Sequence, residues 1–95
     1  MEKRLEAVFK GHVQGVGFRY SVEGLSQKFE VKGYVENLPG GDVQVVAEGE
    51  ETELSAFLLA IRNSYLKNYI RDFEISWKTP TGEFKDFFIR HGGLR

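Results

Sequence analysis

The sequence predicts an α+β sandwich of the ferredoxin-like type, in which two helices cover one face of an antiparallel sheet. Two segments carry apolar side chains at helical spacing, and five short segments have the pattern or composition of strands. Their order is strand, helix, strand, strand, helix, strand, with a short extra strand near the C-terminus. The length of 95 residues predicts a single domain spanning residues 1–95.

The first strand and the first helix flank a glycine-rich stretch. Residues 4–10 alternate between apolar and polar side chains, which predicts a strand. After residues 11–17, apolar side chains recur at positions i, i+4, i+7 and i+11, which predicts a helix of about three turns. The side chains of this stripe are Phe18, Val22, Leu25 and Phe29.

A hairpin and a second helix follow. Residues 31–36 and 43–48 are predicted strands, and the turn residues of 37–42 between them indicate an antiparallel hairpin. We expect Thr52 to be the N-cap of the second helix, and we expect this helix to end near Asn68. The apolar stripe repeats the spacing of the first helix, with Leu54, Leu58, Ile61 and Tyr65.

The C-terminal third supplies the remaining strands. Residues 70–78 alternate, which puts Phe73, Ile75 and Trp77 on one face of a strand. Residues 79–83 are rich in turn formers, and residues 84–91 give a last short strand. The tail, residues 91–95, fits none of these elements.

Composition excludes several kinds of site. The chain has 13 basic and 14 acidic side chains, so its charge indicates neither a nucleic-acid nor a membrane partner. It has no cysteine, which excludes disulfides, thiolate nucleophiles and cysteine-ligated metals. Two separated histidines make a poor metal site, so we expect none. The sequence shows neither a signal peptide nor a spanning segment, and we expect a cytoplasmic protein.

The stretch KGHVQGVGFRY, residues 10–20, has the features of an anion site. In the predicted topology the third strand lies between the first and second, so this loop and Asn37 share a sheet edge, roughly 10 Å apart. Such a loop can turn backbone N–H groups inward, and the following helix adds a partial positive charge. Arg19 supplies a planar cation that matches phosphate. From spacing alone, a plain connecting loop with a solvated arginine fits equally well.

Two segments resemble the signatures of the acylphosphatase family: GHVQGVGFRY at residues 11–20 and GYVENLPGGDVQVVAEG at 33–49. The resemblance covers most of the chain, and it implies a small acylphosphatase with the same ferredoxin-like fold. Such enzymes hydrolyse acyl phosphates to a carboxylate and inorganic phosphate without metal or cofactor. The family's catalytic residues fall on Arg19 and Asn37. The backbone of its phosphate-binding loop falls on His12, Val13, Gln14, Gly15, Val16, Gly17 and Phe18.

The chain departs from the family pattern at three places, and none of them removes the chemistry. One is the tail HGGLR, which runs past the expected last strand. Tyr34 stands where the family most often has tryptophan, and the second helix continues through RNSYLKNYI without the Gly-Pro break often found there. A departing carboxylate has a pKa of about 4 and needs no general acid at pH 7. Arg19 and the loop N–H groups are therefore assigned to the phosphate oxygens, and Asn37 to the attacking water.

Two functions of different classes are compatible with the sequence. The first is a metal-independent acylphosphatase, expected to be a monomer that also takes inorganic phosphate or sulfate as a site ligand. The second is a ferredoxin-like module that binds phosphate or carbamoyl phosphate without turning it over. The presence of both Arg19 and Asn37 favours the enzyme, because binding alone does not require an amide that positions water.

Overall fold

The computed structural model describes residues 1–91, and its elements follow the predicted order with one addition, a short 3₁₀ helix, η1. The elements are β1 (Glu2–Gly11), α1 (Phe18–Ser26), β2 (Val31–Asn37), β3 (Val43–Glu50), α2 (Glu51–Asn63), η1 (Tyr65–Asn68), β4 (Ile70–Lys78) and β5 (Phe87–Arg90). The predicted limits of β4 are confirmed at both ends. Apart from His91, the tail of the chain lies outside the described residues.

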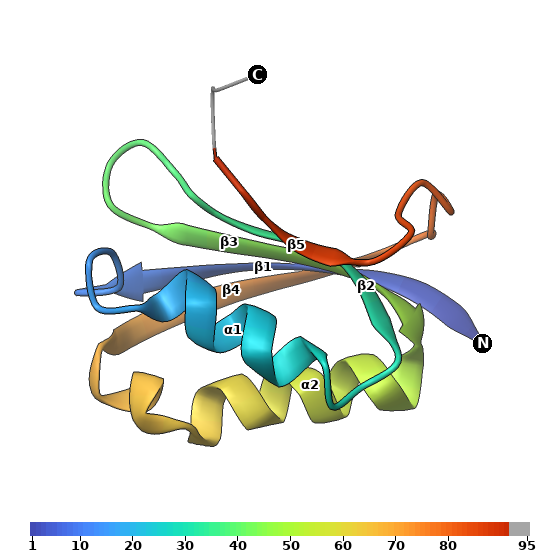
Figure 1. The fold of residues 1–95 in the computed structure, drawn as a ribbon, viewed down its shortest axis with the longest axis horizontal. Helices are drawn as coiled ribbons and strands as arrows, with labels where there is room; N and C mark the ends of the chain where they lie inside the picture. The colour runs from blue at the N-terminus through green and yellow to red at the C-terminus, as the bar shows by residue number, and fades with distance from the viewer. Residues whose placement is uncertain (92–95) are drawn as a thin grey trace.

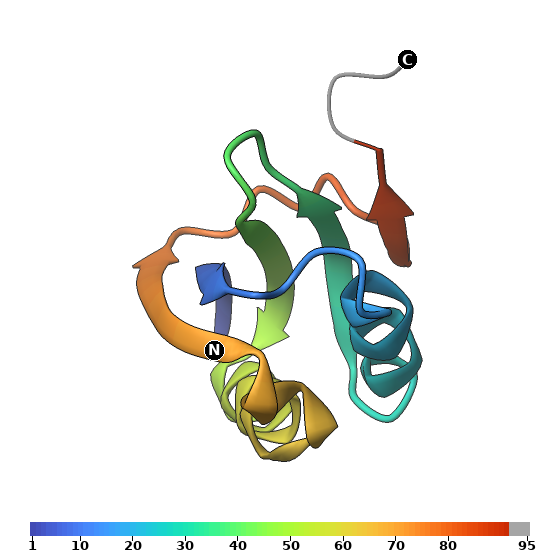
Figure 2. The ribbon, with the colours of Figure 1, turned by 90° about the vertical axis from the view of Figure 1, so that its left-hand side faces the viewer.

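The five strands form one sheet in the order β4-β1-β3-β2-β5. Figure 2 shows this order, with both helices on the same side of the sheet. The first four strands pair antiparallel with one another, as predicted, whereas β5 pairs parallel with β2. The predicted ferredoxin-like sandwich is therefore confirmed, with a mixed sheet rather than a wholly antiparallel one.

The core lies between the sheet and the two helices (Figure 1). Successive strand residues face opposite sides of the sheet, so each central strand sends every second side chain into this layer. The largest fully buried side chains are Phe9, Phe18, Phe57, Leu5, Leu54, Ile61 and Leu66. Burial of each such side chain stabilises the fold by about 1.5–3 kcal/mol. Phe9 of β1 and Phe18 of α1 both belong to this layer, so the core holds the two elements that flank the glycine-rich loop.

The first helix is shorter than predicted. α1 ends at Ser26, and the chain continues in turns in which the N–H groups of Lys28 and Phe29 donate to the carbonyls of Leu25 and Ser26. Phe29 still packs on the core, with its ring 5.9 Å from that of Phe57. The apolar spacing thus identified a core residue correctly, although the helix stops before it.

The second helix begins and ends earlier than predicted. Thr52, the expected N-cap, lies in its first turn. The helix stops at Asn63 rather than near Asn68, because Ser64 adopts an extended backbone and its hydroxyl accepts from the N–H of Leu66. This break starts η1 and turns the chain back toward β4.

The buried face of α2 also differs from the predicted stripe. Leu54 and Ile61 are buried as predicted, but Phe57 is fully buried and Leu58 only partly. Tyr65 belongs to η1 and is 51% exposed. The helix therefore turns an i, i+3, i+7 face toward the sheet.

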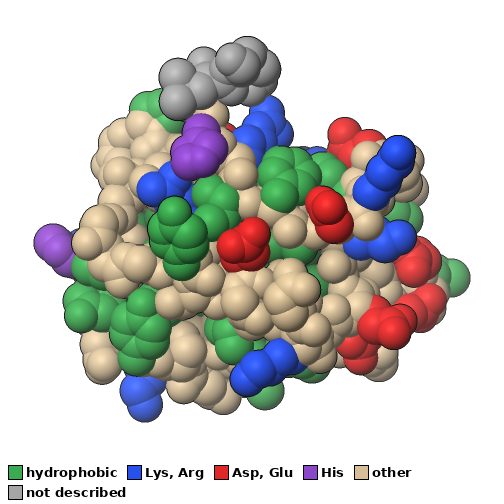
Figure 3. All heavy atoms as spheres, viewed as in Figure 1, with side chains coloured by type: hydrophobic (Ala, Val, Ile, Leu, Met, Phe, Trp, Pro, Cys, Tyr) green, Lys and Arg blue, Asp and Glu red, His purple; other side chains and the backbone are tan. Residues whose placement is uncertain are grey.

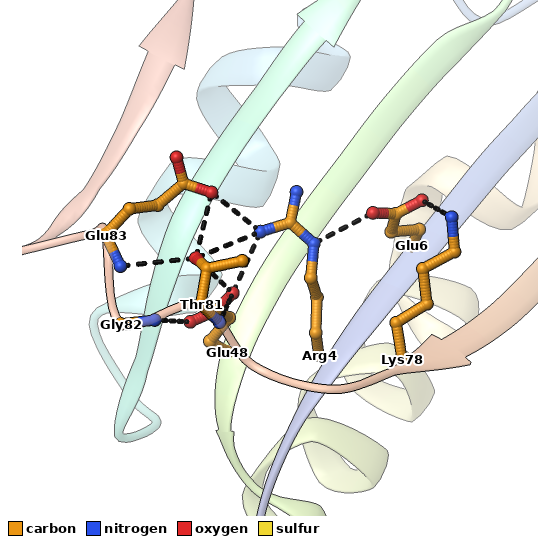
Figure 4. Close-up of polar contacts among 7 residues, drawn as sticks. All are labelled: Arg4, Glu6, Glu48, Lys78, Thr81, Gly82 and Glu83. Carbon is orange, nitrogen blue, oxygen red and sulfur yellow. Dashed lines mark hydrogen bonds and ion pairs between the residues drawn. The ribbon is translucent and has the colours of Figure 1, made fainter.

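On the sheet face opposite the helices, a cluster of charged side chains holds the segment between β4 and β5 (Figure 4). The guanidinium of Arg4 donates to Glu48 at 2.8 Å and to Glu83 at 2.9 Å. Glu48 is only 6% exposed, and it also accepts from the backbone N–H groups of Thr81 and Gly82, both at 2.9 Å. These bonds fasten the segment across the outer face.

The same partners stabilise the ionised form of Glu48. Burial alone would raise its pKa, but two backbone N–H donors and the Arg4 guanidinium outweigh burial and hold the pKa of Glu48 below its ordinary value. Burial alone would also lower the pKa of Arg4, but its carboxylate partners raise that pKa above its ordinary value. Both groups are therefore charged at neutral pH.

Tyr34 packs on the same outer face. Its ring lies 5.7 Å from that of Phe84 and 6.1 Å from that of Phe88. The Arg90 guanidinium lies 4.6 Å from the ring centroid. Burial raises the pKa of the Tyr34 hydroxyl. The segment before β5 thus covers the position at which this chain departs from the family pattern.

Candidate active site

The site is built where two parallel strands end. β1 and β2 flank β3 and run in the same direction, so their C-terminal ends, at Gly11 and Asn37, share one edge of the sheet. Figure 1 shows the loop after β1, the N-terminus of α1 and the turn of the β2–β3 hairpin at this edge. The arrangement on which the sequence argument depends is therefore confirmed.

A cavity of about 110 Å³ lies at this edge. The residues that line it are Val13, Gly15, Gly17, Phe18, Arg19, Tyr20 and Asn37. Both predicted catalytic side chains thus meet the predicted loop in one small cavity. His12, Gln14 and Val16 belong to the loop but do not line the cavity, whereas Tyr20 lines it without having been predicted.

A larger cavity, of about 520 Å³, opens elsewhere, between the end of α1 and the segment before β5. It is lined in part by Phe29, Glu48 and Phe87, and no predicted site residue lines it. The smaller cavity is therefore the candidate active site, because both predicted catalytic residues, Arg19 and Asn37, line it.

Two glycines give the loop its path. Gly15 and Gly17 have φ angles of 80° and 79°, a region that other residues adopt rarely. Gly17 is the N-cap of α1, and no side chain caps this helix. The N–H groups of the first helical turn are therefore available to an anion, which the partial positive charge of the helix N-terminus also attracts.

Val13 and Phe18 anchor the loop in the core. Val13 is 0% exposed and Phe18 2%, and the Phe18 ring lies 5.4 Å from that of Phe9. Because these side chains are buried, the residues offer the cavity their backbone and not a polar group. The polar side chains that line the cavity belong to Arg19, Tyr20 and Asn37.

Gln14 joins the loop to the neighbouring hairpin. Its side-chain amide donates to the carbonyls of Leu38 and Asp42, both at 2.9 Å. Leu38 directly follows Asn37, so these bonds tie the loop to the strand end that carries the predicted catalytic amide. The sequence assigned Gln14 only to the loop backbone, because the partner of a glutamine side chain depends on the folded path of the chain.

Tyr65 also contacts the loop, although its sequence position favours simple packing. Its hydroxyl lies 2.8 Å from the Ser21 hydroxyl and donates to the carbonyl of Val16 at 3.1 Å. The backbone N–H of His12, at the start of the loop, donates to the carbonyl of Tyr69 at 2.9 Å. The connection between α2 and β4 therefore supports the loop from the side opposite the hairpin.

Arg19 keeps its charge available. Its side chain is half-buried, and none of the ion pairs among residues 1–91 includes it. Figure 3 shows acidic side chains gathered toward the right-hand end, where Figure 1 has the N-terminus, away from the loop. Glu51 and Glu53 lie in the first turn of α2, which starts at that end. No carboxylate of the described chain therefore neutralises the guanidinium.

Within residues 1–91, no three His, Cys, Asp or Glu side chains gather in a way that could hold a metal ion. None of the helices in this range is both long enough and apolar enough to cross a membrane.

Comparisons with known proteins identify the family of the chain. The acylphosphatase family model matches residues 5–89. An acylphosphatase of Dehalococcoides mccartyi is 40% identical over 88 residues, covering 92% of this chain and 97% of the relative. An acylphosphatase of Archaeoglobus fulgidus is 42% identical over 87 residues, with the same coverage of both. The crystal structure of the Bacillus subtilis acylphosphatase superposes with a TM-score of 0.85 at 31% identity, covering 93% of this chain and 98% of that one. The chain belongs to the acylphosphatase family.

Proposed function

We propose that this chain is an acylphosphatase, which hydrolyses the carboxyl–phosphate bond of an acyl phosphate to a carboxylate and inorganic phosphate. The observation that carries the proposal is the single small cavity lined by Arg19, Asn37 and the glycine-rich loop. The match to two relatives named acylphosphatase covers 97% of the length of each relative. This near-complete coverage supports the enzyme over a phosphate-binding or carbamoyl-phosphate-binding module.

The phosphate is held by the backbone of residues 12–18 and by the Arg19 guanidinium. The positive φ angles of Gly15 and Gly17 and the uncapped start of α1 support this role, because they favour N–H groups that converge on an anion. The guanidinium contributes a planar pair of donors that matches two phosphate oxygens. Charge on the transferring phosphoryl group is thereby stabilised where it develops.

Asn37 positions the attacking water. An amide both accepts from and donates to a water molecule but cannot remove its proton, so the proton passes to a phosphate oxygen of the substrate. The leaving carboxylate has a pKa of about 4 and departs without a general acid. The reaction therefore requires orientation and charge stabilisation, and it proceeds without a metal or cofactor.

The enzyme acts as a cytoplasmic monomer on small acyl phosphates, and inorganic phosphate or sulfate binds the same site as a product-like anion. Residues 1–95 form one catalytic domain, which the match over residues 5–89 supports.

One assay separates the enzyme from a binding module. The purified chain is incubated with benzoyl phosphate in the presence of EDTA, hydrolysis is followed by absorbance, and phosphate binding is measured by calorimetry. Turnover well above the uncatalysed rate, inhibited by inorganic phosphate, is expected. Phosphate binding without turnover would instead support the module, and turnover abolished by EDTA would refute the metal-free mechanism.

A further inference from the structure

The hydroxyl of Tyr65 reaches the loop from a distant part of the chain. Tyr65 opens η1, and its hydroxyl contacts Ser21 in α1 and Val16 in the loop. Neither contact is needed to build the core, because Tyr65 is 51% exposed.

Counting hydrogens fixes the direction of these bonds. A carbonyl oxygen can only accept, so the single hydrogen of the Tyr65 hydroxyl goes to Val16. The Ser21 hydroxyl must then be the donor in its 2.8 Å contact with Tyr65. The result is a directed chain from Ser21 through Tyr65 to Val16, in which each bond polarises and strengthens the next.

The acceptor in this chain belongs to the peptide that enters α1. The Val16 carbonyl and the Gly17 N–H share one peptide unit, and the described chain has no cis peptide. In a trans peptide the C=O and N–H bonds point in opposite directions. Gly17 lines the small cavity and Val16 does not. Holding the carbonyl on the Tyr65 side therefore directs the Gly17 N–H toward the cavity.

The backbone alone does not secure this orientation. Rotating the peptide changes ψ of Val16 and φ of Gly17, and glycine accepts φ angles of either sign with little strain. A rotated peptide would present a carbonyl oxygen to the anion instead of an N–H donor. The fit at Gly17 is close, since a Cβ built there would lie 3.3 Å from the Tyr65 hydroxyl. The tyrosine thus stands where it opposes this rotation.

We propose that Tyr65 is a positioning residue of the phosphate loop, which sets the Val16–Gly17 peptide so that its N–H faces the substrate phosphate. The inference rests on the proposed function of this loop. It assigns a role to the connection between α2 and β4, where the chain breaks the helix at Ser64 without the Gly-Pro pair often found in the family.

The test compares Tyr65→Phe with Tyr69→Phe. The first variant keeps the ring and its edge-to-face contact with Tyr69, 6.2 Å away, and removes only the hydroxyl. The second removes a hydroxyl from the same connection that forms no hydrogen bond within residues 1–91. Because the Val16 carbonyl can turn to water once the hydroxyl is gone, both variants should melt close to the wild type.

Three quantities are measured: kcat/KM for benzoyl phosphate, the inhibition constant of inorganic phosphate, and the amide shift of Gly17 on adding phosphate. Tyr65→Phe should lower kcat/KM roughly tenfold and raise the inhibition constant of phosphate roughly tenfold. It should also suppress the change in the Gly17 amide shift on adding phosphate. Tyr69→Phe should stay within about twofold of the wild type. Ser21→Ala should fall between them, because it removes one donor but leaves the Tyr65–Val16 bond.

Two outcomes overturn the inference in distinguishable ways. A Tyr65→Phe variant with wild-type kinetics and a wild-type Gly17 response would leave the enzyme assignment standing and refute the role of Tyr65. A wild-type protein that neither binds inorganic phosphate nor hydrolyses benzoyl phosphate would refute the proposed function, and the positioning role with it.

Discussion

Replacing Gln14 by methionine should weaken both the fold and the catalysis. Methionine keeps the length of the side chain but loses the two 2.9 Å hydrogen bonds to the carbonyls of Leu38 and Asp42. Each neutral bond of this kind contributes about 0.5–1.5 kcal/mol, so the pair contributes about 1–3 kcal/mol.

Other hydrogen bonds of the two carbonyls narrow the expected loss in the free energy of unfolding. The Leu38 carbonyl still accepts from the N–H of Gly41, and the Asp42 carbonyl still accepts from the N–H of Leu38. Neither acceptor is left without a partner, so the expected loss is about 1–2 kcal/mol. For a chain of this size, that loss corresponds to a fall in melting temperature of about 4–16 °C.

The assay is thermal unfolding followed by circular dichroism, with Gln44→Met as the matched control. Gln44 lies on β3 opposite Val8, and its side chain forms no hydrogen bond within residues 1–91. If Gln14→Met melted within about 2 °C of this control, the two bonds would not hold the loop to the hairpin. The kcat for benzoyl phosphate should fall together with the melting temperature, because the hairpin carries Asn37 at the end of β2.

The remaining predictions concern one site residue and one structural carboxylate. Arg19→Lys should lower kcat/KM for benzoyl phosphate by about 100-fold or more, because an ammonium cannot replace the bidentate fork; a near wild-type rate would remove Arg19 from the mechanism. Glu48→Gln should reduce the free energy of unfolding at pH 7 by about 1.5–3 kcal/mol, measured by urea denaturation, because the amide offers donors to groups that already donate. Since the folded pKa of Glu48 is lowered, its stabilisation is present above the unfolded pKa of about 4.3 and is lost as the pH falls below it. The difference between wild type and Glu48→Gln should therefore shrink from pH 6 to pH 3, and a constant difference would contradict the ionic account.

Much of the site could be predicted because it depends on topology. A hairpin with a short turn must be antiparallel, so β2 and β3 run in opposite directions. In the predicted fold β1 also pairs antiparallel with β3, so the C-terminal ends of β1 and β2 lie at the same edge of the sheet. That reasoning brought the loop and Asn37 together, and β1, β3 and β2 pair in this way. The C-terminal limit of β4 was predictable because residues 72–78 alternate without interruption and residues rich in turn formers follow.

The features that the sequence did not reveal depend on where side chains arrive. The stripe predicted for α2 included Leu58 and missed Phe57, because both readings have helical spacing and only docking on the sheet decides between them. Trp77 faces the same side as Leu5 but is 43% exposed, since β4 is an edge strand. The Tyr65 contact depends on η1, whose start at the extended residue Ser64 has no strong sequence signal.

In the proposed mechanism, Arg19 and the loop backbone bind the phosphate, whereas Asn37 positions the attacking water. The Asn37→Ala variant tests this separation of roles most directly. The measurement is kcat for benzoyl phosphate together with the inhibition constant of inorganic phosphate, on the same preparation. We predict a fall in kcat of about 100-fold or more, with phosphate inhibition almost unchanged, because the amide acts on the water and not on the bound anion. Parallel losses of turnover and of phosphate affinity would contradict the account and make Asn37 a binding residue.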